Sequence, residues 1–182
     1  CKTDPFFMFH HVNAYQREEE LIIDLLAYDN PSIIENLFDF QKTNNTVDHL
    51  NFNTTLMRYH LYLPDQTIVS ERILESATEF PRINDLFDGK HYHYAYVADI
   101  QDPITQNDKR GLHKIHVDTK MTQSWQEKGC LSGEPVFVPA PNAEKEDDGV
   151  VLAIILNEMK ETSFLLVLEA SSFKEIGRAE VP

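Results

Sequence analysis

Short apolar stretches, rich in β-branched and aromatic residues and separated by turn-forming residues, recur along most of the chain. This pattern is typical of β-strands. We expect strands at residues 6–15, 20–28, 55–63, 67–74, 92–98, 112–117, 122–126, 135–138, 150–157, 164–170 and 178–181. The sequence therefore predicts an all-β fold.

One segment departs from the strand pattern. Between Pro31 and Phe40, apolar residues recur at helical spacing, Asn30 can cap the first turn, and Pro31 suits the first helical position. We expect one short helix here, followed by a long polar loop at residues 42–53.

The turn signals indicate how the strands are connected. Asp88-Gly89, Asp118-Thr119-Lys120, Asp147-Asp148-Gly149 and Asn157-Glu158 each separate two apolar runs and are typical of hairpin connections. Residues 112–122 resemble a hairpin of a propeller blade, although β-sandwiches use such hairpins too. At about 40 to 50 residues per blade, the chain would form three to four blades of a partial β-propeller.

The domain organisation is simple. No change in composition marks a second domain, so residues 1–182 are expected to belong to a single propeller domain. The chain enters an apolar run soon after Cys1 and stops at Val181-Pro182, directly after an extended-looking segment. We expect a piece of a longer protein, truncated at both ends.

Charge excludes one class of partner. The chain has 30 acidic and 16 basic residues, a net charge of −14 and a pI near 4.8, so it would repel nucleic acid.

The longest apolar run of the sequence, residues 150–156, is far shorter than the roughly 20 residues that span a bilayer. With only two cysteines, the chain fits a reducing compartment, and we expect the cytoplasm.

Histidines are the first candidates for chemistry. His10 follows four apolar residues, so we expect it at the end of a largely buried strand, as a metal ligand or as a hydrogen-bonded core residue. His91 and His93 share one strand face and could chelate a metal, although an exposed polar face explains the same spacing.

Other histidines are weaker candidates. His116-Val117-Asp118 matches half of a facial triad, but no second histidine follows it, and Asp118 is better explained as a turn residue that accepts backbone hydrogen bonds. His49 and His60 have no ligand partner at suitable spacing and are expected at the surface.

Two carboxylates stand out by their surroundings. Glu79 and Glu134 lie at the starts of apolar strands and next to proline, where burial is costly unless the carboxylate accepts a hydrogen bond, for example from an imidazole. A solvent-facing strand end is the alternative. Residues 144–148 form a charged run that we expect to be solvated.

Three blocks, in order, resemble the carotenoid cleavage oxygenases. They are residues 5–15 (PFFMFHHVNAY), residues 79–84 (EFPRIN) with the following 89–96, and residues 134–139 (EPVFVP) with 146–152. The resemblance covers nearly the whole chain and is nearest to the animal branch, which includes β-carotene oxygenases, retinoid isomerohydrolases and insect isomerooxygenases.

The resemblance implies a fold, a cofactor and an activity. Members of this family are seven-bladed propellers with a ferrous iron, Fe(2+), held by four histidines, and they use dioxygen to cleave a conjugated double bond of a carotenoid or apocarotenoid to aldehyde products. His10 matches an iron ligand, and Glu79 and Glu134 match carboxylates that orient the ligands. His11 points away and is not carried over. Peripheral membrane association is a further expectation.

The resemblance also implies that the chain is incomplete as an enzyme. Two ligands would precede Cys1 and the last would follow Pro182, while no match to a ligand position is found at His91, His93, His113 or His116. One imidazole cannot retain iron, so the isolated chain is expected to be inactive. The alternatives are a retinoid isomerohydrolase, an enzyme that both cleaves and isomerises its substrate, and a catalytically dead propeller that binds lipid or acts as a scaffold.

Overall fold

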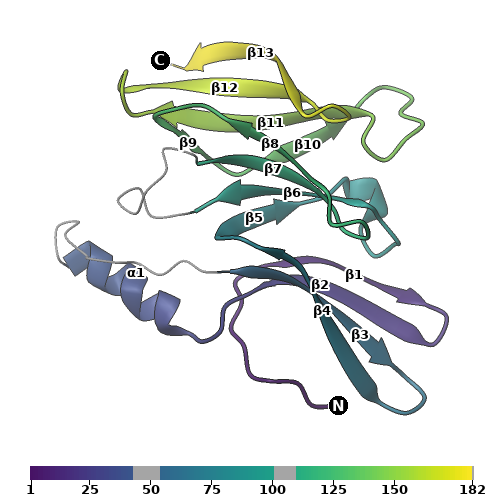
Figure 1. Cartoon of the computed structure of the whole chain (residues 1–182). Helices are drawn as coiled ribbons and strands as arrows, with labels where there is room; N and C mark the ends of the chain where they lie inside the picture. Colours follow the sequence, from purple (N-terminus) through teal and green to yellow (C-terminus); the bar gives the residue numbers. More distant parts are fainter. Residues whose placement is uncertain (43–53, 101–109, 182) are drawn as a thin grey trace.

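The computed structural model describes residues 1–42, 54–100 and 110–181 of the chain. These residues form three antiparallel sheets, stacked one on another, with one α-helix beside them (Figure 1). Sheet 1 consists of β1 (His11–Arg17), β2 (Glu20–Ala27), β3 (Thr55–Tyr62) and β4 (Thr67–Glu75). Sheet 2 consists of β5 (Thr78–Arg82), β6 (Tyr94–Asp99), β7 (Gly111–His116) and β8 (Thr122–Gln126).

Sheet 3 completes the stack. It consists of β10 (Val136–Pro139), β11 (Gly149–Asn157), β12 (Thr162–Glu169) and β13 (Lys174–Val181), and the short β9 (Cys130–Ser132) also pairs with β11. In each sheet, apart from β9, strands that follow one another in sequence are hydrogen-bonded neighbours. This is the arrangement expected of propeller blades, and the all-β prediction is confirmed.

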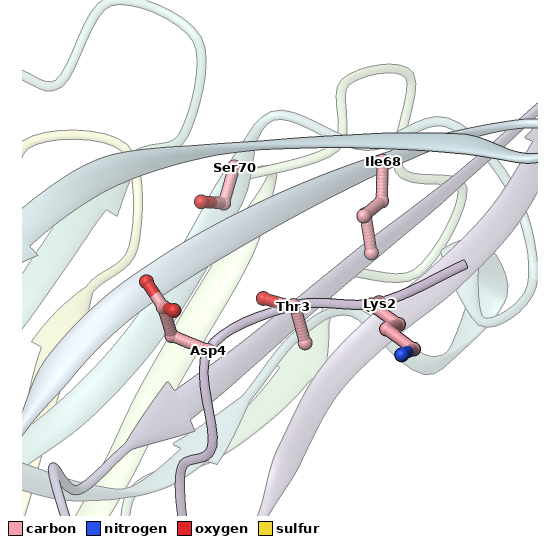
Figure 2. A pocket seen from close by; sticks show the side chains of 5 residues that line it. All are labelled: Lys2, Thr3, Asp4, Ile68 and Ser70. Carbon is pink, nitrogen blue, oxygen red and sulfur yellow. The ribbon is translucent and has the colours of Figure 1, made fainter.

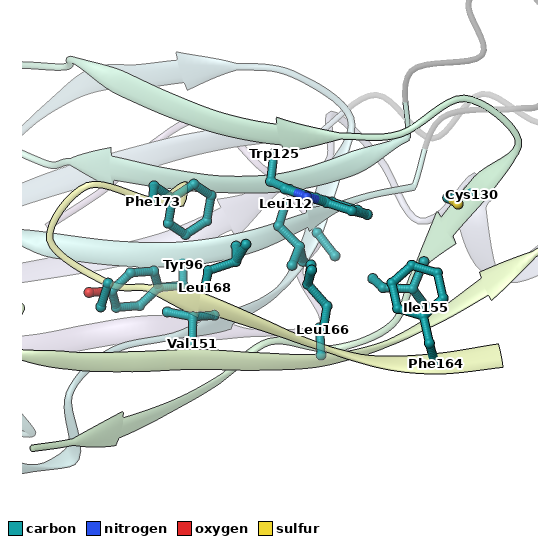
Figure 3. Packing of buried hydrophobic residues seen from close by; sticks show 13 residues of the cluster. Tyr96, Leu112, Trp125, Cys130, Val151, Ile155, Phe164, Leu166, Leu168 and Phe173 are labelled. Atoms are coloured by element: carbon teal, nitrogen blue, oxygen red, sulfur yellow. The ribbon is translucent and has the colours of Figure 1, made fainter. Parts of the chain in front are cut away.

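Sheet 2 lies in the middle, and its strands β6 and β7 are buried on both faces. Alternate residues of β6 enter two separate cores: Tyr96 and Ala98 pack against sheet 3, whereas Ala95 and Val97 pack against sheet 1. The period of two follows from strand geometry. Figure 3 shows the core between sheets 2 and 3, where the Trp125 ring lies above the aliphatic side chains of sheet 3.

Two helical segments interrupt the strands. Helix α1 (Ser32–Lys42) matches the expected helix, and its first turn is capped because the Ser32 amide donates to Asn30 Oδ1 at 2.9 Å. The 3₁₀ turn η1 (Asp85–Phe87) was not predicted. The loop expected at residues 42–53 lies almost entirely outside the described residues. Among the described residues, no helix is long and apolar enough to cross a membrane.

The connections largely follow the turn signals. Residues 118–120, 147–148 and 158 lie in the antiparallel hairpin connections β7–β8, β10–β11 and β11–β12, while Gly149 and Asn157 are the end residues of β11. Asp88-Gly89 instead lies in a longer connection after η1, where Gly89 adopts a φ of +70°. Gly89 therefore allows a left-handed turn within that connection and is not part of a tight hairpin.

The first predicted strand is wrong at its start. Residues 5–10 are not part of sheet 1. An isolated bridge between Phe7 and Tyr28 and a hydrogen bond from the Leu26 amide to the His10 carbonyl attach them to it, and β1 begins at His11. The apolar side chains at 6–8 are half-buried instead of fully buried. Strands β5 and β9 were not predicted as separate strands because they are short, and β5 contains a proline.

Candidate functional site

His10 lies at the junction between the N-terminal segment and β1. Its carbonyl oxygen accepts a hydrogen bond from the Leu26 amide at 3.2 Å, and the amides of Phe7 and Tyr28 exchange hydrogen bonds with each other's carbonyl groups. These contacts fix the backbone on both sides of the imidazole. The expectation of a buried side chain is wrong, since the His10 side chain is 47% exposed.

The buried carboxylate of Glu79 binds this imidazole. His10 Nδ1 lies 2.7 Å from Glu79 Oε2, the Tyr28 hydroxyl donates to Oε1 at 2.7 Å, and the Phe80 amide donates to Oε2 at 3.3 Å. Burial, together with the hydrogen bond and negative charge of Glu79, raises the pKa of Tyr28 well above 10, so the phenol remains a donor. The carboxylate thus orients His10 and favours the tautomer with the proton on Nδ1.

An irregularity in strand β5 sets the orientation of the Glu79 side chain. The β5–β6 register shifts between Glu79 and Arg82, and Phe80 in this bulge has a φ of +57°. A bulky side chain in the left-handed region is strained and is found mostly where function fixes the backbone. The bulge turns Glu79 inward and leaves the Phe80 ring 6.0 Å from that of His10.

An apolar cavity opens beside the imidazole. Its volume is about 400 Å³, within the range of small-molecule sites. The lining residues are Phe9, His10, Tyr28, Ile33, Leu37, Glu79, Phe80 and Ile100. His10 Nε2 has no hydrogen-bond partner within the described parts of the chain. An imidazole held by a carboxylate at Nδ1, with a free Nε2 beside an apolar cavity, is the usual arrangement of a metal-binding histidine.

Comparison with known proteins identifies the family. The family model described as retinal pigment epithelial membrane protein matches residues 1–182. The chain belongs to this family. The resemblance inferred from the sequence is confirmed by the relatives, which are carotenoid dioxygenases.

Relatives from this family cover the chain almost completely. The chain is 33% identical to β,β-carotene 15,15'-dioxygenase of Rattus norvegicus, over 98% of the chain and 36% of the relative. It is 30% identical to the mitochondrial carotenoid-cleaving dioxygenase of Homo sapiens, over 99% and 37%, and 32% identical to torulene dioxygenase of Fusarium fujikuroi, over 98% and 36%. The chain thus spans about a third of the length of these relatives.

Solved structures confirm the fold expected for the family. A variant of Synechocystis apocarotenoid oxygenase superimposes with a TM-score of 0.81 at 22% identity, over 96% of this chain and 36% of that one. The cobalt-substituted Synechocystis enzyme gives 0.79 at 22% identity, with the same coverage. The three stacked sheets are therefore the partial propeller that the sequence predicted.

Glu134 lies apart from His10. It follows β9 and forms an ion pair with Arg82 of β5 at 2.5 Å, and both side chains are about half exposed. Among the described residues, no histidine contacts Glu134. Its assignment as a ligand-orienting carboxylate of the family remains a prediction.

A second histidine group lies before β6. His91 and His93 flank the fully buried Tyr92, and together with Asp118 of the β7–β8 turn they offer ligand atoms that all lie within 4.8 Å of one another. His116 is not part of this group. The Asp118 carboxylate was expected to accept backbone hydrogen bonds, but it binds the Arg58 guanidinium at 2.7 Å instead.

Several polar groups are less exposed than the sequence indicated. Glu146 belongs to the run expected to be solvated, yet it is buried and accepts hydrogen bonds from the amides of His93 and Tyr94. His60 is half-buried, with its Nδ1 2.6 Å from Glu20 Oε1. His49 lies outside the described residues.

A second depression lies between the N-terminal segment and β4. Figure 2 shows Ile68 and Ser70 projecting from β4 towards Lys2, Thr3 and Asp4. Among the residues that the structure describes, its lining includes no histidine or cysteine. The cavity beside His10 therefore remains the better candidate for chemistry.

Proposed function

We propose that this chain is part of a non-haem iron dioxygenase that cleaves a conjugated double bond of a carotenoid or apocarotenoid to aldehyde products. Family membership and the names of the relatives support the reaction class. The observation that carries the proposal is the pairing of His10 with buried Glu79 at the edge of an apolar cavity. Dioxygen is the second substrate.

The chain's residues fit an iron centre as one part of its ligand set. His10 would bind Fe(2+) through Nε2, while Glu79 holds the proton on Nδ1. His10 is the only histidine in the cavity lining, as far as the structure describes it, so the other ligands must come from elsewhere in the full-length protein. Iron, when bound, supplies a site for dioxygen beside the substrate.

The remaining lining residues explain the type of substrate. Phe9, Ile33 and Phe80 offer aromatic and aliphatic surface without hydrogen-bonding groups, which favours a polyene over a polar molecule. Tyr28 and Glu79 are already hydrogen-bonded to each other, so neither presents an unsatisfied polar group to the cavity. The cavity binds an apolar chain and excludes water from it.

The test uses the full-length protein and two adjacent histidines. In His10→Ala, iron content, dioxygen uptake and aldehyde formation should fall to background. His11→Ala is the matched control, since His11 is exposed and starts β1 with its side chain outside the cavity lining. Wild-type iron content in His10→Ala would refute ligation by His10.

Product analysis tests the reaction itself. Aldehydes with fewer carbon atoms than the substrate support oxidative cleavage, whereas an isomer with all carbon atoms retained would indicate an isomerohydrolase. A folded wild-type protein that binds neither iron nor dioxygen would contradict both oxidative cleavage and isomerohydrolase activity, and would support a non-catalytic lipid-binding propeller.

Glu134 is proposed to orient another iron-binding histidine of the full-length protein. Because it now pairs with Arg82, the control must remove that ion pair separately. Glu134→Gln should lower iron affinity, while Arg82→Gln should leave it unchanged. Equal effects of the two substitutions would assign Glu134 to the ion pair alone.

We propose a cytoplasmic location with peripheral membrane contact through α1. The helix exposes Ile34, Leu37 and Phe38, and Leu37 also lines the cavity. An apolar helix face next to the cavity would admit a lipid-soluble substrate. Phe38→Ser should reduce co-sedimentation with phosphatidylcholine vesicles; unchanged co-sedimentation would contradict this contact.

A further inference from the structure

The group formed by His91, His93 and Asp118 has no role in the reaction proposed above. His91 Nε2 lies 3.8 Å from Asp118 Oδ2, the two imidazole rings lie 4.7 Å apart between centroids, and the three ligand atoms lie within 4.8 Å of one another. None of the three residues lines the cavity at His10. We propose that they form a second metal site, which binds a zinc ion.

The orientation of His93 supports this site independently. Glu146 accepts hydrogen bonds from the His93 amide at 2.8 and 3.0 Å and from the Tyr94 amide at 2.8 Å, and its Oε2 lies 2.8 Å from His93 Nδ1. The buried carboxylate therefore favours the proton on Nδ1. The lone pair on Nε2 is then available, as in the carboxylate–histidine–zinc arrangement.

Asp118 is fixed on one side and open on the other. Its Oδ1 accepts a hydrogen bond from Arg58 at 2.7 Å, and Asp24 holds the same guanidinium through two further bonds. This leaves Oδ2 on the side of His91. Asp24, Asp118 and Glu146 together offset the positive charge of Arg58, so the surroundings favour a cation.

The donor set selects the metal. Two imidazole nitrogens and one carboxylate oxygen suit zinc, with water in the fourth position, and do not suit calcium or magnesium, which prefer oxygen. Bonds of about 2.0–2.1 Å place tetrahedral donors roughly 3.4 Å apart. The present separations of up to 4.8 Å require the side chains to close in by up to about 1.4 Å, which partly exposed side chains can do.

Zinc at this position would lie at the junction between sheets 1 and 2. Asp118 belongs to sheet 2 and is tied to Arg58 of sheet 1, while the His91 ring packs edge-on against Tyr15 of β1 at 5.5 Å. The ion would link the β7–β8 turn to the segment before β6 at this junction.

The experiment is a zinc titration of the full-length protein, followed by calorimetry. It is done in the wild type and in His10→Ala, because the second background removes binding at the proposed iron site. We expect one zinc equivalent that persists in His10→Ala and raises the thermal unfolding temperature. Its absence from both backgrounds would overturn the proposal, whether or not the protein binds iron.

Variants in the His10→Ala background assign the ligands. His91→Gln should weaken zinc binding at least tenfold, and it leaves the Glu146 and Arg58 hydrogen bonds intact, so the fold is preserved. His116→Gln is the matched control, since its ring lies 5.6 Å from that of His93 but offers no ligand to the group. Unchanged affinity in His91→Gln, or an equal loss in His116→Gln, would refute the assignment.

Cobalt gives a second readout. Co(2+) at this site should show the visible absorption bands of a tetrahedral ion, and Glu146→Gln should weaken its binding by about 10- to 100-fold, because a neutral amide replaces the carboxylate that accepts from the His93 ring. Far-ultraviolet circular dichroism confirms that this variant is folded. A folded Glu146→Gln protein with wild-type cobalt affinity would show that Glu146 does not position the ligand.

Discussion

The buried ion pair between Asp24 and Arg58 yields the strongest stability prediction. Two hydrogen bonds of 2.8 Å join the side chains, which are 1% and 5% exposed, and the Tyr92 hydroxyl donates to Asp24 at 2.6 Å. Arg58→Met removes the guanidinium with little change in volume. Asp24 then keeps a charge in the core with a single hydrogen bond from Tyr92.

The cost follows from the stranded carboxylate. Removing one partner of a buried pair costs about 3–5 kcal/mol, because an uncompensated charge stays out of water. The bond from Arg58 to the more exposed Asp118 adds at most about 1 kcal/mol. We therefore expect Arg58→Met to lower the free energy of unfolding by about 3–5 kcal/mol.

Urea denaturation of the full-length protein at pH 7 measures this loss. The triple variant Asp24→Leu, Arg58→Met, Tyr92→Phe is the control, since it replaces the whole polar network by apolar groups and should recover most of the stability. A loss below about 1 kcal/mol in Arg58→Met would refute the reasoning, as would a triple variant no more stable than the single one.

Three further predictions concern other parts of the chain. Glu79→Gln should weaken iron binding by about 10- to 100-fold in a chelator competition, and wild-type affinity would contradict its orienting role. Gly111→Ala should cost about 1–3 kcal/mol in thermal denaturation, because the new Cβ would clash with the backbone of β8, and an unchanged melting temperature would contradict this. Arg178 lowers the pKa of Glu127 and of Glu175 through hydrogen bonds, so these contacts stabilise the fold only while the two carboxylates are ionised. The difference in unfolding free energy between the wild type and Arg178→Met should therefore be full above pH 4.5 and should disappear as the pH falls through the lowered pKa values. A difference that does not depend on pH would contradict this.

The sequence predicted the strands with strong alternation or clear turns. In β11 and β12 buried side chains alternate with half-buried or exposed ones over most of their length, and the Asn157-Glu158 turn between them is recognisable. β5 and β9 could not be found in this way, since they are short strands whose pairing is decided by their neighbours. The segment before His11 looked like a strand because apolar content alone does not indicate pairing.

In the candidate site, too, local sequence patterns identified some features, whereas contacts between distant residues decided the others. His10 and Glu79 were named from the family resemblance, but their contact joins residues 69 positions apart, which no local pattern can reveal. The role of Glu146 was missed because a charged run normally lies in water, whereas here three N–H groups compensate its burial. Pairing across the sheets, rather than composition, decides which carboxylates are buried.

The contact between His10 and Glu79 joins two different sheets. His10 directly precedes β1 of sheet 1, while Glu79 belongs to β5 of sheet 2. The two sheets share one of the two cores that sheet 2 contributes to. A fluctuation that separates them would break the hydrogen bond to the imidazole, so the orientation of His10 depends on the packing between these sheets.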